Sequence, residues 1–110
     1  MRPTRFYSKQ QEKQVAKQNK GKIVANSGAT RFDKGDVKTE QFLIECKTKI
    51  SSTNSFSIKK DWLEKNKEEA FAMGKRYSAL AFNYGPDEPN YYVIDEKLFT
   101  YLRDVLEEEE

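Results

Sequence analysis

The sequence of 110 residues contains no histidine and only one cysteine, Cys46. Histidine is the usual general base and a common metal ligand, and a disulfide needs two cysteines. These shortages exclude an internal disulfide framework, a zinc site built from cysteines and histidine-based catalysis. Catalytic chemistry in this chain has to use carboxylates and lysines, with or without a hard cation that prefers oxygen ligands.

Long apolar runs are also missing. No stretch approaches the ~20 residues of a membrane span, and no hydrophobic stretch of a signal peptide follows Met1–Arg5. We therefore expect a cytoplasmic protein. Hydrophobic residues make up 36% and aromatic residues 13% of the chain, which favours a folded protein over a disordered one. The length predicts one domain, residues 1–106, followed by an acidic tail, residues 107–110.

Charge is distributed unevenly along the chain. Residues 1–60 hold 14 Lys and Arg against 5 Asp and Glu, whereas residues 61–110 hold 6 against 13. A basic half indicates a polyanionic partner, because neutralisation of phosphates drives nucleic-acid binding. A solvated lysine-rich surface without a partner is the alternative interpretation.

Local patterns predict a mixed β-sheet flanked by helices, which is an α/β fold. Helices are expected over residues 8–19, 58–73 and after residue 95, and strands over residues 22–25, 77–84 and 91–94, with a β-hairpin within 36–49. The order is therefore one helix, three strands, a helix, two strands and a last helix. Apolar residues expected to face the core from the second and third helices are Ile58, Trp62, Leu63, Ala70, Phe71, Met73, Leu98, Phe99, Leu102 and Val105.

Capping signals define the expected ends of the helices. Ser8 and Gln11 form the S-x-x-Q pattern of a capping box, and Ser57 and Asp95 are expected to cap the other two helices. Gly74 is expected to end the second helix in the left-handed conformation. In the last strand the adjacent residues 91 and 92, both tyrosines, must face opposite sides of the sheet. One is expected in the core, and the other is available for stacking.

The predicted hairpin carries the most informative residues. On its second arm Glu45 and Lys47 share one face, while Cys46 points into the core as a small apolar residue. If Asp36 begins the paired arm, its carboxylate comes near that of Glu45, and two adjacent carboxylates repel each other. A Mg²⁺ ion between them removes this conflict and promotes hydrolysis of phosphate esters. Mn²⁺ is expected to substitute, and Lys47 can orient the attacking water.

At this point the residues resemble a known family. Asp36, eight intervening residues and Glu45-x-Lys47, reached through a hydrophobic strand, resemble the active-site signature of the PD-(D/E)xK nuclease superfamily. The proline that usually precedes the aspartate is Gly35 in this chain.

Two further segments resemble archaeal-type Holliday junction resolvases within that superfamily. Residues 26–31 resemble a loop that is rich in Ser and Gly and contains an Arg, and residues 11–15 resemble a first-helix motif that carries a Glu. The likeness extends from about Ser8 to Asn83, and the last 25 or so residues of the chain add no further signature.

The resemblance implies a restriction-endonuclease-like fold and a Mg²⁺-dependent, structure-specific DNA endonuclease, most similar to a Holliday junction resolvase. By position, the implied catalytic residues are Asp36, Glu45, Lys47, Glu12 and Ser27, the last beside the scissile phosphate. The implied metal ligands are Asp36, Glu45, the backbone carbonyl of Cys46 and, directly or through water, Glu12. Two symmetrical cuts in a four-way junction require two active sites, so a homodimer is implied. The small size and the resemblance together suggest that a bacteriophage or prophage encodes the protein.

Basic residues flank these positions. Those expected to bind DNA are Lys13, Lys17, Lys20, Lys22, Arg31, Lys34, Lys49, Lys59 and Lys60. Because no base-reading helix or zinc finger is recognisable, we expect recognition of backbone shape rather than of sequence.

Other functions fit the same residues. A nuclease of this fold acting on forks, flaps or DNA ends is one alternative. A non-catalytic nucleic-acid-binding module, with Glu45 and Lys47 as an ordinary surface pair, is another. In that interpretation Asp36 is a turn residue and Glu12 a surface residue of a helix. An acid-tailed protein-interaction factor, which would have no salt-dependent affinity for DNA, is the third.

Overall fold

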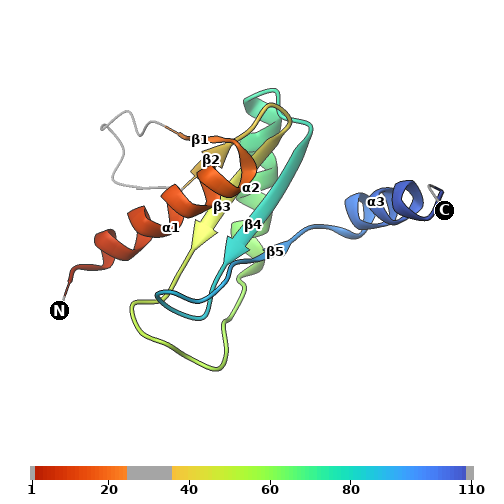
Figure 1. Ribbon diagram of the computed structural model, residues 1–110. Coiled ribbons are helices and arrows are strands. Elements are labelled where there is room, and N and C mark those ends of the chain that lie inside the picture. The colour runs from red at the N-terminus through yellow and green to blue at the C-terminus, as the bar shows by residue number, and fades with distance from the viewer. Residues whose placement is uncertain (1, 25–35, 109–110) are drawn as a thin grey trace.

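The computed structural model describes residues 2–24 and 36–108. Within these residues the chain forms an α/β domain with three helices and one five-stranded mixed sheet (Figure 1). The elements are, in chain order, α1 (Thr4–Asn19), β1 (Lys22–Ile23), β2 (Asp36–Lys38), β3 (Phe42–Lys47), α2 (Lys60–Ala72), β4 (Tyr77–Phe82), β5 (Tyr91–Val93) and α3 (Glu96–Glu108). No helix in the described part of the chain is both long and apolar enough to span a bilayer.

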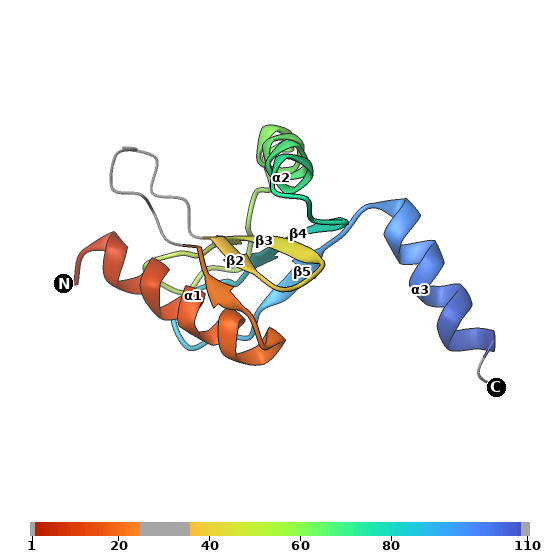
Figure 2. The ribbon, with the colours of Figure 1, turned by 90° about the horizontal axis from the view of Figure 1, so that it is seen from above.

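The strands lie in the order β1-β2-β3-β4-β5. All neighbouring strands are antiparallel except β3 and β4, which are parallel. A parallel pair needs a crossover connection, and α2 supplies it. Figure 2 shows α1 on one face of the sheet and α2 on the other. The expectation of a mixed sheet flanked by helices is therefore confirmed.

The hydrophobic core on the α1 side contains Val15, Val37, Ile44, Cys46, Ala79 and Ala81. Residues of β3 alternate between this core and the opposite face, as the period of two along a strand requires. Cys46 is 9% exposed and belongs to the core, as predicted. Its neighbours Glu45 and Lys47 therefore project from the face that α2 covers.

Two buried amides attach the helices to the centre of the sheet. On the α1 side, Gln11 Nε2 donates hydrogen bonds to the carbonyl oxygens of Lys47, at 2.8 Å, and Ala81, at 3.2 Å. On the α2 side, Asn66 Nδ2 donates to the carbonyl oxygens of Leu43, at 3.3 Å, and Ala79, at 2.9 Å. Each side chain thus bridges the parallel strands β3 and β4.

The ends of the helices correct two of the predicted caps. The first helix already begins at Thr4, so the Ser8 hydroxyl lies inside it and donates to the Thr4 carbonyl at 3.4 Å. The expected capping box is therefore wrong, because the N-cap is Pro3, whose extended conformation suits a helix start. The second helix begins at Lys60, after Lys59, so Ser57 does not cap it.

Two other predictions about helix ends are confirmed. The backbone of Gly74, directly after the C-cap of α2, has a φ of +73° in the left-handed region. Asp95 caps α3, since its Oδ1 accepts a hydrogen bond of 2.8 Å from the backbone N–H of Leu98. The same aspartate forms an ion pair of 2.8 Å with Lys67 of α2 and thereby fixes the start of α3.

The predicted burial of the apolar residues on α2 and α3 is partly wrong. On α3 only Leu98 is buried, because the helix projects away from the sheet (Figures 1 and 2). The side chains of Phe99, Leu102 and Val105 are exposed. On α2, Phe71 is 86% exposed and Met73 is 41% exposed.

The two tyrosines of β5 face opposite sides, as predicted, but neither is buried. Tyr91 stacks near the ring of Phe82, with centroids 5.8 Å apart. The Tyr92 hydroxyl accepts a hydrogen bond from Asn19 and donates one to Gln18, both near the end of α1. The expectation that one of the tyrosines lies in the core is therefore wrong.

Candidate active site

The strand register places Asp36 of β2 directly opposite Glu45 of β3. Directly opposite residues of an antiparallel pair project from the same face, with Cβ atoms about 4.5–5.5 Å apart. Asp36 is 4% exposed and the side chain of Glu45 is 12% exposed. The expected proximity of these two acidic positions is confirmed by the register, whereas their chemical role stays a prediction.

A tight turn sets this register. The Thr39 backbone N–H donates to the carbonyl oxygen of Phe42, and the Phe42 N–H donates to the Thr39 hydroxyl, both at 3.0 Å. The Lys75 ammonium donates to the carbonyl oxygen of Thr39 at 2.8 Å, which anchors the turn to the segment before β4. A shift of one residue in this turn would move Glu45 away from Asp36.

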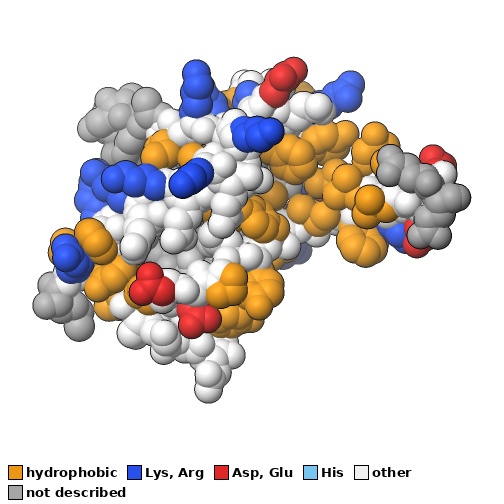
Figure 3. Space-filling view, viewed as in Figure 1, with side chains coloured by type: hydrophobic (Ala, Val, Ile, Leu, Met, Phe, Trp, Pro, Cys, Tyr) orange, Lys and Arg blue, Asp and Glu red, His pale blue; other side chains and the backbone are white. Residues whose placement is uncertain are grey.

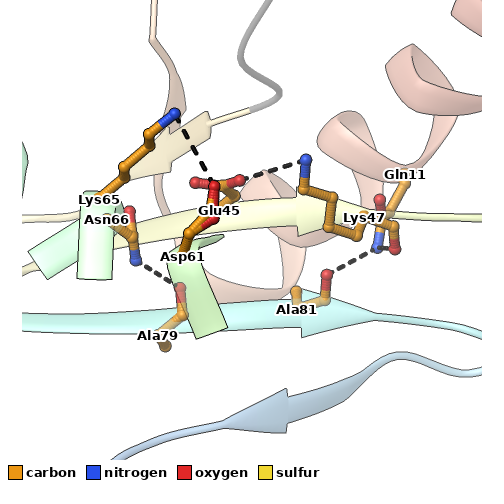
Figure 4. Close-up of polar contacts among 8 residues, drawn as sticks. All are labelled: Gln11, Glu45, Lys47, Asp61, Lys65, Asn66, Ala79 and Ala81. Atoms are coloured by element: carbon orange, nitrogen blue, oxygen red, sulfur yellow. Dashed lines mark hydrogen bonds and ion pairs between the residues drawn. The ribbon is translucent and has the colours of Figure 1, made fainter. Parts of the chain in front are cut away.

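Lys47 lies between an acid and an aromatic ring. Its Nζ is 3.3 Å from Oε2 of Glu45 (Figure 4) and 4.4 Å from the ring centroid of Trp62. A cation over the face of an indole ring is attracted by the ring quadrupole. Trp62 is half-buried and holds the lysine, so its predicted role as core alone was incomplete.

The backbone of Lys47 is also held. Gln11 reaches its carbonyl oxygen from α1 (Figure 4) and donates to Asn90 Oδ1 at 3.1 Å. Asn90 in turn accepts from Asn83 at 3.1 Å, and Asn83 Oδ1 accepts from the Thr48 hydroxyl. The end of β3 is therefore tied to α1 and to the β4–β5 connection. The sequence carries no signal for this network: there Gln11 is part of a capping pattern and of the first-helix motif, and neither predicts a buried amide that bonds to two strands.

Glu12 of α1 lies near the end of β3. Burial, followed by the negative charges of Glu12, Asp36 and Glu45, raises the pKa of the Cys46 thiol far above its usual range. Cys46 faces the α1 side of the sheet, whereas Glu45 and its partner position Asp36 project from the opposite face. Glu12 also lines, with Cys46 and Lys47, a depression of about 330 Å³ between α1 and the end of β3. This depression contains neither Asp36 nor Glu45, so the role of Glu12 stays a prediction.

The carboxylates of the candidate site suit Mg²⁺ better than a metal ion whose ligands are all protein atoms. Among residues 2–24 and 36–108, no three His, Cys, Asp or Glu side chains are arranged closely enough to form a metal cage. Mg²⁺ binds through one or two carboxylates and keeps several water ligands, so it needs no such cage. Two largely buried carboxylates on one sheet face, Asp36 and Glu45, provide a suitable pair.

The described lysines of the predicted DNA-binding set all lie exposed in two groups. The first group, along α1 and β1, comprises Lys13, Lys17, Lys20 and Lys22, and Figure 3 shows Lys and Arg side chains gathered over this region. The second group, after β3 and at the start of α2, comprises Lys49, Lys59 and Lys60. Three other predicted site residues lie outside the described residues, namely Ser27, Arg31 and Lys34. The same holds for the whole of segment 26–31, which resembles the resolvase loop.

Aromatic rings accompany the second group. Lys49 Nζ lies 5.2 Å from the ring centroid of Phe56, and Lys59 Nζ lies 5.7 Å from that of Trp62. Phe56 also contacts Phe82, with centroids 5.0 Å apart. Basic and aromatic side chains are therefore combined on the sheet face that carries Glu45 and Lys47.

Comparisons of the chain with protein-family models, with curated proteins and with solved structures found no match. The resemblance to the PD-(D/E)xK superfamily therefore depends on the residues and spacings given above and stays a prediction.

Proposed function

We propose that this protein is a Mg²⁺-dependent endonuclease of restriction-endonuclease-like fold that cuts branched DNA as a homodimer, in the manner of a Holliday junction resolvase. The observation that supports this proposal most strongly is the pairing of Asp36 with Glu45, together with the contact of Lys47 with Glu45. The sequence motif fixes only the spacing of these residues. Their common sheet face is a separate, geometric requirement for the same chemistry.

In this proposal Asp36 and Glu45 hold the Mg²⁺ ion. The backbone carbonyl of Cys46 and the carboxylate of Glu12, directly or through water, complete the protein ligands. Bound there, Mg²⁺ supplies positive charge that favours attack of water on a phosphodiester. The two carboxylates therefore position the cation, and the largely buried setting of both strengthens their electrostatic effect.

The role proposed for Lys47 is to orient the attacking water and to offset negative charge that develops on the phosphate. Glu45 and Trp62 restrict its ammonium from two sides. Gln11 fixes the backbone from which the side chain extends. Preorganisation of this kind reduces the rearrangement needed during the reaction.

The exposed lysines supply the affinity for DNA in this proposal. Contacts to about six phosphates predict that the logarithm of the binding constant falls with the logarithm of salt concentration with a slope of about −5. Contacts of this type follow the DNA backbone, so selectivity would come from the shape of a branch point.

The direct test is cleavage of a four-way junction, a fork, a nicked duplex and a linear duplex in the presence of Mg²⁺. We expect the wild type to cut the junction and the Glu45→Gln variant to bind it without cutting. Glu40→Gln is the matched control, because Glu40 is an exposed acid at the turn of the same hairpin. Equal cleavage of linear duplex would contradict junction specificity. Absence of cleavage of every substrate by the wild type would refute the enzymatic function.

A further inference from the structure

Aromatic residues continue the row of side chains that begins at Lys47. The strand registers place Lys47 of β3 beside Phe82 of β4, and Phe82 opposite Tyr91 of β5. Residues paired in this way project from the same face of a sheet. The preceding row on that face contains the paired positions Asp36 and Glu45. The aromatic rings therefore lie directly beside the candidate active site.

Phe82 contacts three other rings. Its centroid lies 5.0 Å from that of Phe56 and 5.5 Å from that of Tyr84. The ring of Tyr91 is nearly stacked on it, with centroids 5.8 Å apart and planes that differ by 29°. We call Phe56, Phe82, Tyr84 and Tyr91 the aromatic row. Tyr91 is 51% exposed and the other three rings are half-buried, so the aromatic row is only partly covered.

Backbone contacts hold the segment that carries Phe56 against the end of β4. The Thr53 backbone N–H donates to the carbonyl oxygen of Tyr84 at 2.8 Å. Gly85 has a φ of +144°, and a Cβ atom there would lie 2.7 Å from the Cα of Ser52, so this close approach requires glycine. The ring of Phe56 is therefore placed beside β4 before any ligand binds, which lowers the entropic cost of binding.

The charges near the aromatic row differ between its two ends. At the Phe56 end, Lys49 Nζ lies 5.2 Å from the ring centroid of Phe56, and the exposed Lys59 follows three residues later. At the β5 end, the connection from β4 carries the exposed acids Asp87 and Glu88. A bound polyanion is therefore expected to place its phosphates at the Phe56 end.

Unpaired nucleotides suit this combination of groups better than duplex DNA does. Bases inside a duplex stack on one another, so their faces are not accessible to side chains, whereas every unpaired base offers a free face. Proteins that bind single strands combine a basic surface with aromatic rings on which successive bases stack. The lysines beside the aromatic row match the phosphates of such a strand, and the rings match its bases.

We propose that the aromatic row binds unpaired nucleotides of the DNA substrate. The DNA that is cut beside Lys47 then has a single-stranded segment next to the scissile phosphate. This inference rests on the proposed nuclease function for the position of the cut, but the binding itself needs neither metal nor cleavage. The substrate class is thereby narrowed to branched DNA with unpaired nucleotides at the branch point.

The test is the binding of a fluorescent oligothymidylate of about 12 nucleotides and of a duplex of the same length, measured by anisotropy without divalent metal. Tyr91→Ala should weaken binding of the single strand roughly 5- to 150-fold, the loss expected for one base–aromatic stack, and leave the affinity for the duplex unchanged. Tyr92→Ala is the matched control, because Tyr92 is the adjacent tyrosine on the opposite face of β5. It should keep both affinities.

Tyr91 is exposed, so its variant is expected to fold, and far-UV circular dichroism checks this. A wild type that does not bind the single strand overturns the proposal. The same holds if Tyr91→Ala keeps the wild-type affinity, or if Tyr92→Ala loses as much. Because this measurement omits metal, absence of cleavage would refute the nuclease function without removing the binding of single strands.

Cleavage with Mg²⁺ tests the substrate class separately. The wild type should cut a four-way junction with a few unpaired thymidines at the branch point faster than a fully paired junction. Tyr91→Ala should remove this difference, and Tyr92→Ala should retain it. Equal rates of the wild type on the two junctions would overturn the assignment of an unpaired segment to the substrate.

Discussion

Asp36 and Glu45 face each other across the β2–β3 hairpin, although eight residues separate them in the sequence. Burial raises the pKa of the Cys46 thiol, and the negative charges of both acids raise it further. Two largely buried carboxylates on directly opposite residues repel each other unless a positive charge lies nearby. Lys47 provides one such charge, and a divalent cation would provide the other.

Replacement of Asp36 with Asn should abolish stabilisation by Mg²⁺. A ligand that binds only the folded state raises the free energy of unfolding by about 2.7 kcal/mol at a hundred times its dissociation constant. We expect Mg²⁺ to raise the melting temperature of the wild type and of Asp61→Asn, an exposed control, but not that of Asp36→Asn. An equal rise in all three proteins, measured by thermal denaturation, would contradict the assignment of Asp36.

Replacement of Trp62 with Leu should slow cleavage without weakening DNA binding. The ring contributes a cation–π interaction of about 0.5–2 kcal/mol to the position of Lys47. This corresponds to a decrease in kcat of roughly 2- to 30-fold. Trp62→Phe keeps an aromatic face and should restore most of the rate. A change in KM at constant kcat would instead indicate that Trp62 contacts the DNA.

Replacement of Gln11 with Leu should destabilise the fold. The change leaves the buried carbonyl oxygen of Ala81 and the partly buried one of Lys47 without their side-chain donor, and an unsatisfied buried group costs about 1–3 kcal/mol. Gln10→Leu, one position earlier and less buried, is the control and should change stability much less. Urea denaturation measures the free energy of unfolding of both variants. Equal free energies of unfolding for the two variants would show that the amide does not hold the sheet.

Sequence patterns predicted the hairpin and its acid pair because each depends on local rules. Alternation along 42–47 fixes which residues share a face, and the polar turn at 39–41 limits the possible registers. The cap at Asp95 and the left-handed Gly74 also follow from local conformational preferences. Such features need no knowledge of the rest of the fold.

Features that depend on tertiary contacts could not be predicted. Helical periodicity identified the apolar side of α3, but it does not reveal what covers that side, and Phe99 and Leu102 are exposed. The proximity of Lys47 to Trp62 and the reach of Gln11 across β3 and β4 join segments 15 to 70 residues apart. The spacing of residues within one segment carries no signal for them.

The thiol of Cys46 should make stability depend on alkaline pH. Its pKa is raised in the folded protein by burial and by the neighbouring carboxylates, so the folded state retains the proton longer than the unfolded state. The stabilising contribution is complete below the ordinary cysteine pKa, about 8.5, and is lost above it by up to ~1.4 kcal/mol per pH unit.

A comparison with Cys46→Ala isolates this effect. The difference in free energy of unfolding between wild type and variant should stay constant near neutral pH. It should then shift against the wild type as the pH rises toward about 10, where the unfolded thiol is ionised. Urea denaturation across this range provides the values. A difference that does not change with pH would show that the folded thiol ionises normally.

The claim that Asp36 and Glu45 share one divalent cation beside Lys47 is tested most directly by a crystal grown with Mn²⁺. Anomalous scattering locates this ion independently of the protein phases. We predict one strong peak between the two carboxylates that is lost in the Glu45→Gln variant. A peak elsewhere, or carboxylates that bind no ion in the crystal grown with Mn²⁺, would contradict the account.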